Sequence, residues 1–467
     1  MDLLLTHGYF LYEDEKELQI MRPYPPLGLL YLCSHLRAKG IAAEVFDVTF
    51  SSRQQLFDLL RGGNPSVLGV YANLKTRPVV VEILKAAKEA GWKTIVGGPE
   101  PGSYAREYLL AGADVIAIGE GELVLEELLP ALREGSSTAL AAVKGIAFMG
   151  EDGTVHWTPP GKQIANLDTQ PWPAREAIDF GKYLEVWRKH HGVASVSLLC
   201  ARGCPYHCNW CSRTVFGNTH RRRSPALVVD ELQWMLERYT PELAWMADDV
   251  FTIHHGWLYE YAAEMKRRGL KVPFECISRA NRIDPKIADT LAELGCFRIW
   301  IGSESGSQRI LDAMERGVTV EGVRKAVDLC KSRGIETGMF LMWGYDGEEL
   351  KDIEASIGHV KHTRPDVFLT TVVYPVKGTG YYDKVSDRIM SNTSWEKGSD
   401  RDLQVKGRPS RSFYQGVDRL LRSEVELARL LDGRDLPDAS MVEALRSRIA
   451  EERSNVHTGW HAAENRQ

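Results

Sequence analysis

Short runs of apolar residues alternate with stretches of helical apolar spacing over about the first 130 residues. This alternation predicts strands at Leu3–Thr6, Ala43–Asp47, Val67–Tyr71, Thr94–Val96 and Ala113–Ile118. It predicts helices at Leu27–Lys39, Gln54–Arg61, Pro78–Ala90 and residues 122–133. Glycines at the carboxyl ends of the strands favour a doubly wound, Rossmann-like parallel sheet of the α/β class, which binds ligands at those ends.

The pattern changes at about residue 139. Two short apolar runs, Gly145–Met149 and Val155–Trp157, flank Asp152-Gly153, and this arrangement predicts a β-hairpin. Several prolines follow and predict an extended linker that reaches about residue 190: Pro159, Pro160, Pro171 and Pro173.

A second strand–helix alternation begins at about residue 191. Its predicted strands are Ala194–Leu199, Leu243–Met246, Phe274–Ile277, Phe297–Ile301, Glu336–Met342 and Val367–Val373. About six such units predict a partial parallel (β/α)6 barrel.

The remaining residues are polar at first, then strongly helical from Phe413 to Glu452, with a tail at His457–Gln467 that we expect to be frayed. The predicted domains are residues 1–138, 139–190, 191–388 and 389–467.

Composition restricts the possible classes of function. Hydrophobic residues make up 44% and charged residues 26% of the chain, as in soluble globular proteins. The net charge of −5 gives no electrostatic reason to expect a nucleic-acid partner. No apolar run approaches the roughly 18 residues of a membrane span, and Met1–Thr6 lacks the basic flank of a signal peptide. We therefore expect a cytoplasmic protein.

The eight cysteines are too few and too unevenly spread for a disulfide framework. Five of them lie in apolar surroundings and are expected to be buried small hydrophobes: Cys33, Cys200, Cys276, Cys296 and Cys330.

The other three, Cys204, Cys208 and Cys211, fall within eight residues, after the first strand of the predicted barrel. Three thiolates on one loop can each hold one iron of a cubane cluster and leave the fourth iron open. A zinc site would need a second Cys-x-x-Cys pair or histidines. His207 and His220 are nearby, but the sequence has no second pair. The spacing therefore favours a [4Fe–4S] cluster over zinc.

Cys204-x-x-x-Cys208-x-x-Cys211, with Trp210 before the last cysteine, resembles the signature of the radical S-adenosylmethionine (SAM) superfamily. Arg202-Gly203-Cys204-Pro205 resembles its cobalamin-binding-domain subfamily. The likeness covers about residues 1–390 and includes Pro25–Leu29, Gly97–Pro99, Gly119–Glu122, Asp248–Phe251, Glu275–Arg279, Gly302–Ser307, Phe340–Glu348 and Tyr374–Gly380.

The resemblance implies roles for individual residues. The three cysteines would be the catalytic centre, where the open iron chelates SAM and an electron from the cluster cleaves it to a 5′-deoxyadenosyl radical. Arg279 would bind the methionyl carboxylate, and Glu304 or Ser305 the ribose hydroxyls, in keeping with their hydrogen-bonding chemistry.

Alternatives remain for several of these residues. Arg279 could form a structural salt bridge, and Asp248 and Asp249 could be cofactor ligands or a helix cap and turn. Tyr206 and Trp210 could contact the cofactors or only shield the cluster from solvent.

The resemblance also implies cobalamin in the N-terminal domain. The Asp-x-His-x-x-Gly string that supplies a lower axial histidine in other cobalamin folds is absent, and Tyr71–Arg77 offers no histidine. The radical subfamily commonly binds cobalamin without histidine, which suits methyl transfer. Leu74 would then lie beneath the corrin, and the glycine loops would admit the nucleotide tail: Gly97, Gly98 and Gly119, with Glu120 in the last matching string. The alternative is a vestigial N-terminal domain that binds no cobalamin and only packs on the barrel.

The leading functional hypothesis is a cobalamin-dependent radical methyltransferase that acts on an unactivated carbon of a small molecule. Natural products, lipids and tetrapyrroles are the substrate range that the resemblance implies, with flavodoxin or ferredoxin as an external electron donor. One alternative is a radical cyclase or rearranging enzyme without net methyl transfer. A non-enzymatic, metal-stabilised binding scaffold is less favoured. The basic cluster Arg401, Lys406, Arg408 and Arg411 is expected to be a solvated face, with substrate or phosphate contact as the alternative.

Overall fold

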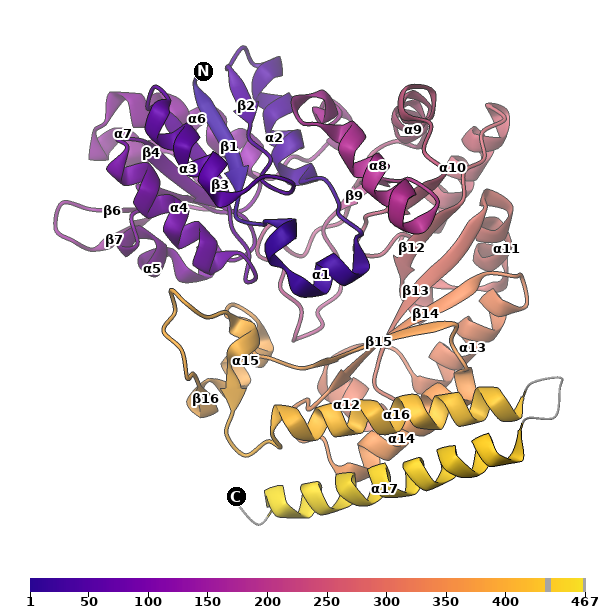
Figure 1. Ribbon diagram of the computed structural model, residues 1–467. Coiled ribbons are helices and arrows are strands. Elements are labelled where there is room, and N and C mark those ends of the chain that lie inside the picture. The colour runs from indigo at the N-terminus through magenta and orange to yellow at the C-terminus, as the bar shows by residue number, and fades with distance from the viewer. Residues whose placement is uncertain (433–437, 465–467) are drawn as a thin grey trace. The chain divides into compact units, whose positions relative to one another are not determined.

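The computed structural model describes residues 1–432 and 438–464, and it divides into two compact units (Figure 1). The first unit comprises residues 1–205, 212–245 and 392–402. The second comprises residues 206–211, 246–391 and 403–467. Both units are therefore assembled from segments that are distant in the sequence.

The first unit is built on a seven-stranded sheet with the order β2-β1-β3-β4-β5-β6-β7. Its strands are β1 (Leu3–His7), β2 (Ala43–Val45), β3 (Val67–Tyr71), β4 (Lys93–Gly97), β5 (Val115–Ala117), β6 (Ile146–Met149) and β7 (Val155–Trp157). The first five are parallel, and β6 and β7 add as an antiparallel hairpin. The predicted hairpin thus extends this sheet.

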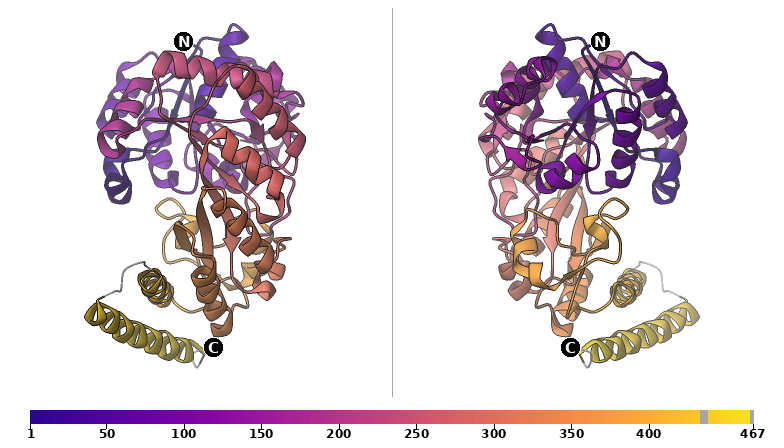
Figure 2. Two further views of the ribbon diagram at one scale, coloured as in Figure 1. Left: turned by 90° about the vertical axis from the view of Figure 1, so that its right-hand side faces the viewer. Right: turned by 90° about the vertical axis from the view of Figure 1, so that its left-hand side faces the viewer.

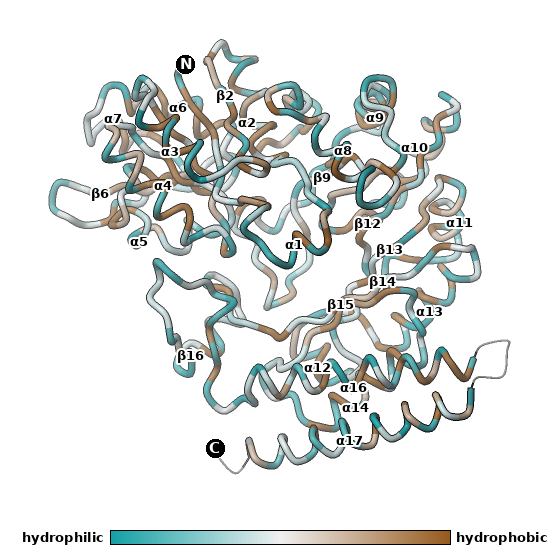
Figure 3. Tube along the Cα trace, viewed as in Figure 1, coloured by the Kyte–Doolittle hydropathy of each residue, from teal (hydrophilic) through white to brown (hydrophobic). Residues whose placement is uncertain are grey.

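Helices cover both faces of this sheet. One core cluster joins the sheet to α3 (Arg53–Gly62), α4 (Arg77–Glu89) and α5 (Ala105–Leu110), and another joins it to α2 (Leu27–Ala38) and α6 (Gly121–Glu134). Figure 3 shows apolar stretches along the strands and apolar and polar stretches in turn along the helices. The amphipathic spacing of the sequence therefore produces the predicted doubly wound arrangement.

The rest of the first unit was partly missed by the sequence pattern. Short helices α1 (Glu15–Ile20) and α7 (Ser137–Ala142) were not predicted, and the predicted linker ends in a regular helix, α8 (Phe180–His191). Helix α8 begins at Asp179, whose side chain accepts from the Lys182 N–H, and it buries Phe180, Tyr183, Leu184 and Trp187. Prolines in the preceding residues masked this helix.

A segment after the predicted barrel, residues 392–402, belongs to the first unit and is clamped there by Arg77. The buried guanidinium of Arg77 donates through Nε to Glu100 Oε1 at 2.8 Å and through Nη2 to Asp400 Oδ1 at 2.7 Å. It also lies over the rings of Tyr104 and Trp395. Because Arg77 begins α4 and Glu100 follows β4, this contact fixes the segment at the carboxyl ends of β3 and β4.

Replacing Arg77 with methionine should lower the free energy of unfolding by about 3–5 kcal/mol, because two buried carboxylates lose their cation. Urea denaturation of the apoprotein measures this change. The matched control is Arg53→Met, which removes a partly exposed arginine paired with Glu13 and should cost about 1 kcal/mol or less. Equal losses in the two variants would contradict a structural role for the Arg77 clamp.

The second sheet has six strands in the order β15-β14-β13-β12-β11-β8. Their bounds are β8 (Ser195–Leu198), β11 (Leu243–Met246), β12 (Phe274–Ser278), β13 (Cys296–Glu304), β14 (Glu336–Trp343) and β15 (Val367–Val372). Strands β12 to β15 pair in parallel. The predicted partial barrel, and with it the α/β fold class, is confirmed.

Helices follow these strands in regular alternation. They are α9 (Pro225–Tyr239), α10 (His255–Arg267), α11 (Pro285–Leu294), α12 (Gln308–Ala313), α13 (Val320–Lys331), α14 (Leu350–Thr363) and α15 (Gly380–Val385). Within the second unit, α11 and α13 pack on β13. Two small antiparallel pairs complete the strands: β9 (Ala201–Arg202) with β10 (Arg221–Arg222), and β16 (Ile389–Met390) with β17 (Gln404–Val405).

The C-terminal region consists of two helices, α16 (Arg411–Leu431) and α17 (Ala439–Glu464), which lie side by side (Figure 2). Phe413 near the start of α16 contacts Trp460 near the end of α17, so the helices are antiparallel. The predicted frayed tail is wrong up to Glu464, where α17 ends, and residues 465–467 lie outside the described residues. No helix among the described residues is long and apolar enough to cross a membrane.

Candidate functional site

The carboxyl ends of β12 and β13 bring together two residues singled out in the sequence, Arg279 and Glu304. Arg279 directly follows β12, and Glu304 ends β13. The two strands pair in parallel, so their carboxyl ends meet at one edge. Both side chains are buried there. The edge is where ligands of parallel α/β sheets bind.

Glu304 has an unusual backbone conformation. Its φ of 55° lies in the left-handed region, which costs a residue other than glycine about 1–3 kcal/mol. The register of β13 against β14 also shifts between Gly302 and Glu304. Such a bulge redirects a side chain out of the regular alternation of a strand. The chain therefore bends at the point where the Glu304 carboxylate enters the site.

Arg316 is the residue of this site that the sequence pattern missed. Its buried guanidinium donates through Nε to Glu304 Oε2 at 2.7 Å and through Nη2 to the Gly302 carbonyl at 3.1 Å. A side chain at Gly302 would collide with this guanidinium, because its Cβ would lie 2.3 Å from Nη2. Gly302 lies in a string that matches the family, but nothing in its sequence context points to a partner 14 residues further on.

Cys208 lies against two guanidiniums. Arg279 Nη1 is 3.3 Å and Arg316 Nη1 3.7 Å from its sulfur. Burial raises the pKa of the Cys208 thiol, and the positive charge of Arg279 opposes that rise. A bound metal ion would supply the remaining charge needed to hold a thiolate. The surroundings of Cys208 therefore fit an anionic metal ligand.

Tyr206 holds Arg279 in place. The Arg279 guanidinium lies over the Tyr206 ring, 3.7 Å from its centroid, and the Tyr206 hydroxyl accepts from Arg282 Nε. Arg279 Nη2 donates to the Arg316 carbonyl. With Cys208 and Asn281, Arg279 thus has four neighbours that orient it, and its predicted alternative of a simple salt bridge is not what is observed.

The three cysteines belong to different units. Cys208 and Cys211 lie in the second unit and Cys204 in the first. Cys208 is buried, and the other two are partly exposed. Within residues 1–432 and 438–464, no group of three or more His, Cys, Asp and Glu side chains is gathered around a common centre. The other five cysteines are buried, as predicted.

The serines of the Gly302–Ser307 string point away from Glu304, toward α14. Ser303 Oγ is 3.0 Å from His359 Nε2, Ser305 Oγ is 3.1 Å from Ser356 Oγ, and Ser307 Oγ donates to Asp352. Glu304 faces the other way because the bulge and its left-handed backbone take it out of the regular alternation of the strand. Of the two residues predicted to bind ribose, Ser305 is fully buried against a helix.

His359 should make the protein sensitive to acid. Burial and Arg324 lower the pKa of His359 to about 4, below the roughly 6.5 of an unfolded chain. As pH falls from 7 to 5, the unfolded chain takes up a proton that the folded chain does not, so this histidine removes about 2 kcal/mol of stability.

The His359→Gln variant should therefore lose about 2 kcal/mol less than the wild type between pH 7 and pH 5. Unfolding free energies at the two pH values measure the difference, and other acid-sensitive groups cancel in the comparison. The same pH dependence in both proteins would contradict a neutral, buried His359.

Buried polar atoms at this end of the second unit have unmet hydrogen-bonding capacity. Among the described residues, the indole N–H groups of Trp210 and Trp343 and one oxygen of Glu348 have no hydrogen-bond partner. Burial raises the pKa of Glu348 to about 8, while its other oxygen accepts from the Gly344 N–H at 2.6 Å. Asp248 is also buried, just after β11. The two indole N–H groups and the Glu348 oxygen are therefore buried polar atoms that the described residues do not satisfy.

The predicted cobalamin residues lie in loops at the carboxyl ends of the first sheet. Leu74 is partly exposed in the loop after β3, which Asn73 fixes by accepting from the N–H groups of Lys75 and Thr76. Gly98 has a φ of 116°, and a Cβ there would lie 2.3 Å from the Ala72 carbonyl. Glycine is therefore required at 98 because the backbone there lies against Ala72, the first residue after β3. Gly97 and Gly119 have no such collision.

Glu120 is held within the first unit. Its buried carboxylate pairs with Arg202 and Arg221 and accepts from the Ile164 N–H at 3.1 Å. Arg202 also binds Glu122 at 2.6 Å. The structure thus gives Glu120 a different role from the predicted cofactor contact: it ties the loop before α6 to the strand that precedes Cys204.

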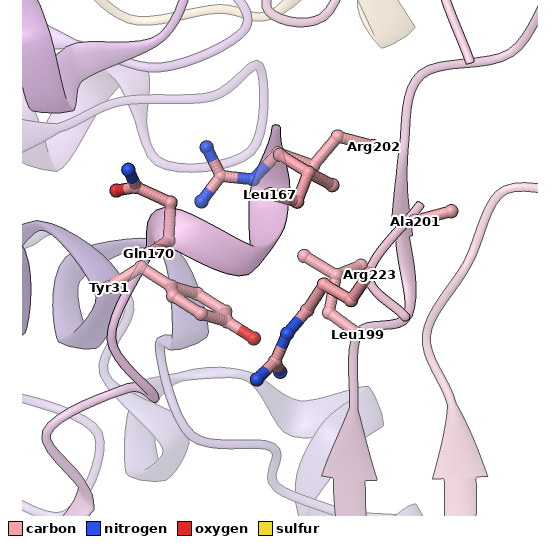
Figure 4. A pocket seen from close by; sticks show the side chains of 7 residues that line it. All are labelled: Tyr31, Leu167, Gln170, Leu199, Ala201, Arg202 and Arg223. Carbon is pink, nitrogen blue, oxygen red and sulfur yellow. The ribbon is translucent and has the colours of Figure 1, made fainter. Parts of the chain in front are cut away.

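A small cavity lies next to this ion-pair cluster (Figure 4). Two guanidiniums and the Tyr31 hydroxyl border it, but Arg202 is paired with glutamates and Arg223 with Glu231. Its full lining is Tyr31, Leu167, Gln170, Leu199, Ala201, Arg202 and Arg223. The positive charge around the cavity is therefore already balanced by protein carboxylates.

Among the basic residues of the C-terminal region, Arg408 is structural. Its Nη1 donates to the carbonyls of Gly344 and Val373, at the ends of β14 and β15. Lys406 and Arg411 are exposed, in agreement with a solvated face, and Arg401 is partly exposed.

Comparison with known families identifies two domains in this chain. A model of the radical SAM superfamily matches residues 198–360, and a model of the B12 binding domain matches residues 20–129. The chain is a radical SAM protein with a B12-binding domain. The resemblance identified from the cysteine motif is confirmed.

Several known proteins are similar to this radical SAM protein over most of its length. An uncharacterized methyltransferase of Pyrococcus horikoshii is 29% identical over 82% of this chain and 83% of its own. An anaerobic magnesium-protoporphyrin IX monomethyl ester cyclase of Rubrivivax gelatinosus is 27% identical over 79% and 68%. The structure of the radical SAM methyltransferase TsrM from Kitasatospora setae, with cobalamin and a [4Fe–4S] cluster, shares this fold: TM-score 0.70, 20% identity, 85% and 81% coverage.

Proposed function

We propose that this radical SAM protein is a cobalamin-dependent enzyme that transfers a methyl group to a carbon of a small molecule. The observation that carries the proposal is the presence, in one chain, of a radical SAM domain with the three-cysteine motif and a B12-binding domain. Relatives named as methyltransferases support the reaction type.

Cys204, Cys208 and Cys211 would hold a [4Fe–4S] cluster. When bound, the cluster, SAM and cobalamin together supply radical formation and a methyl group. The chain's own part is positioning. Cys208 lies in a buried environment with two N–H donors to its sulfur, and such hydrogen bonds tune the potential of iron–sulfur clusters.

Arg279 and Glu304 are suited to the two polar ends of SAM. A guanidinium has five N–H donors, and Asn281, Cys208 and Arg316 take three of those of Arg279, which leaves donors for the methionyl carboxylate. Glu304 would accept from the ribose hydroxyls, while Arg316 keeps its carboxylate oriented. Burial raises the pKa of Glu304 to about 8, and the positive charge of Arg279 opposes that rise. Ser305 is a weaker candidate because it is bound to Ser356. Trp210 and Asp248 would contribute to the same site.

In the first unit, the rigid Asn73–Thr76 turn would present Leu74 beneath the corrin ring, and the loops at Gly97, Gly98 and Gly119 would border the nucleotide tail. The Arg77 clamp supports this arrangement because it fixes the end of that turn and the loop after Gly98 in one place. Leu74 would line the cobalamin site with a hydrophobic side chain, and the cobalamin bound there would supply the methyl group.

The alternative is a radical cyclase without net methyl transfer, since relatives named as cyclases match the chain over a similar length. The products distinguish the two. A methyltransferase that regenerates its methyl donor from a second SAM forms S-adenosylhomocysteine together with 5′-deoxyadenosine.

The decisive experiment incubates anaerobically reconstituted protein with cobalamin, a chemical reductant and SAM, and quantifies both nucleosides by mass spectrometry. We expect both products, and their loss in the variant with Cys204, Cys208 and Cys211 replaced by alanine. 5′-Deoxyadenosine without S-adenosylhomocysteine would favour the cyclase, and no absorbance from an iron–sulfur cluster would contradict the radical enzyme altogether.

Glu304→Gln should weaken SAM binding by about 10–100-fold, the cost of disrupting the hydrogen bonds that the buried Glu304 carboxyl group would make to the ribose. Because this variant also leaves Arg316 unpaired, Glu304→Gln/Arg316→Gln serves as the matched control that restores charge balance. Equilibrium binding of SAM to the reconstituted proteins measures both. Normal binding by the double variant would contradict a direct contact between Glu304 and SAM.

A further inference from the structure

Asn209, between Cys208 and Trp210, has every polar group of its backbone and side chain engaged within the second unit. Its backbone N–H donates to the Met314 carbonyl at 3.2 Å, and its carbonyl accepts from the Tyr381 N–H at 2.8 Å. Its side-chain Nδ2 donates to the Ala313 carbonyl at 2.9 Å, and Oδ1 accepts from the Tyr345 hydroxyl at 3.0 Å. One residue of the cysteine loop thus contacts three other elements.

The partners are groups that helices leave unsatisfied. The last carbonyls of a helix and its first N–H groups have no partner within the helix. Ala313 ends α12 and Met314 follows it, so Asn209 satisfies carbonyls at the end of α12. Tyr381 is the second residue of α15, so the Asn209 carbonyl satisfies an N–H at the start of α15. The backbone of Asn209 thus satisfies one group at each of two helix ends, and its side-chain amide adds a donor to the Ala313 carbonyl.

The surrounding residues fit this arrangement closely. A Cβ at Gly380 would lie 3.4 Å from the Asn209 Cβ, so glycine lets α15 approach the loop. Tyr345 is 1% exposed, and its ring packs against Tyr381 at a centroid distance of 5.0 Å. The Tyr345 hydroxyl also lies 2.8 Å from the Ala313 carbonyl, which fixes it beside the Asn209 amide. Asparagine is the side chain with both a donor for Ala313 and an acceptor for Tyr345 at this length.

We propose that Asn209 is the positioning residue that holds the turn from Cys208 to Cys211 in the conformation needed to retain iron. The turn itself is closed by the Cys211 N–H, which donates to the Cys208 carbonyl at 3.2 Å. Asn209, the second residue of this turn, is anchored to the end of α12 and the start of α15, so the turn is tied to two helices of the second unit. Preorganised ligands retain a metal longer than ligands on a mobile loop. The inference rests on the proposed iron–sulfur cluster.

The experiment compares full-length, anaerobically reconstituted wild type with Asn209→Ala and Asn209→Asp. The aspartate variant keeps the length and the acceptor for Tyr345 but places a carboxylate oxygen against the Ala313 carbonyl. Asn166→Ala is the matched control, since Asn166 is exposed in the first unit and accepts one backbone N–H from Asp168. The measurements are the rate of iron release to a chelator, the EPR spectrum of the reduced cluster, and the thermal midpoint of the apoprotein.

Both Asn209 variants should release iron about 10-fold faster or more, as for other residues that orient metal ligands, with an altered EPR spectrum. Asn166→Ala should match the wild type. Tyr345→Phe removes one partner of Asn209 and should lower the thermal midpoint with a smaller effect on iron release. Should Asn209→Ala fail to fold, Asn209→Asp carries the test.

The proposal is overturned if the Asn209 variants release iron at the wild-type rate, or if iron release follows the thermal midpoint identically in the Asn209 and Tyr345 variants. A wild type that binds no cluster would instead contradict the proposed function, so the two failures are distinguishable.

Discussion

Buried arginines paired with carboxylates hold the functional loops of this protein. Arg77 joins Glu100 and Asp400, Arg202 joins Glu120 and Glu122, and Arg316 joins Glu304. Each pair lies at or next to the carboxyl end of a strand. Loops there cannot be stabilised by the strand hydrogen bonds that end before them, so another interaction must fix them. Paired, hydrogen-bonded charges fix such loops in one geometry, because separating the partners would leave a buried charge without a counter-charge.

The arginine pairs also explain how segments distant in the sequence are held together within each unit. Arg77 brings residues 392–402 to the first sheet, and Arg202 connects the strand before Cys204 to the loop before α6. Arg316 connects α12's end to β13 and to Cys208. In the second unit, Asn209 fixes the same cysteine loop with neutral hydrogen bonds. In the second unit, Arg316 and Glu304 next to the cysteine loop therefore form an ion pair, whereas Asn209 within the loop forms only neutral hydrogen bonds.

The strained backbone of Glu304 is held by one of these ion pairs, the pair with Arg316. A bulge and a left-handed backbone turn the carboxylate away from the side on which Ser303, Ser305 and Ser307 pack against α14. The neighbouring ion pair with Arg316 and the serine hydrogen bonds compensate for that conformation. A strained residue that is overdetermined by its neighbours is characteristic of ligand sites.

The sequence by itself determined the two βα repeats, the burial of five cysteines and the family, because these depend on local apolar periodicity and on one compact motif. It also placed Arg279 and Glu304 at strand ends, where a parallel sheet must bring them together. It did not find α8, because prolines obscured the helical spacing, or the continuation of α17 to Glu464. Only the tertiary structure decided that Glu120 binds Arg202, that Arg316 pairs with Glu304, and that Asn209 bonds the end of α12 and the start of α15. Those contacts join residues up to 172 positions apart, from 209 to 381, and no local pattern records which distant group will satisfy a buried charge or an unpaired helix end.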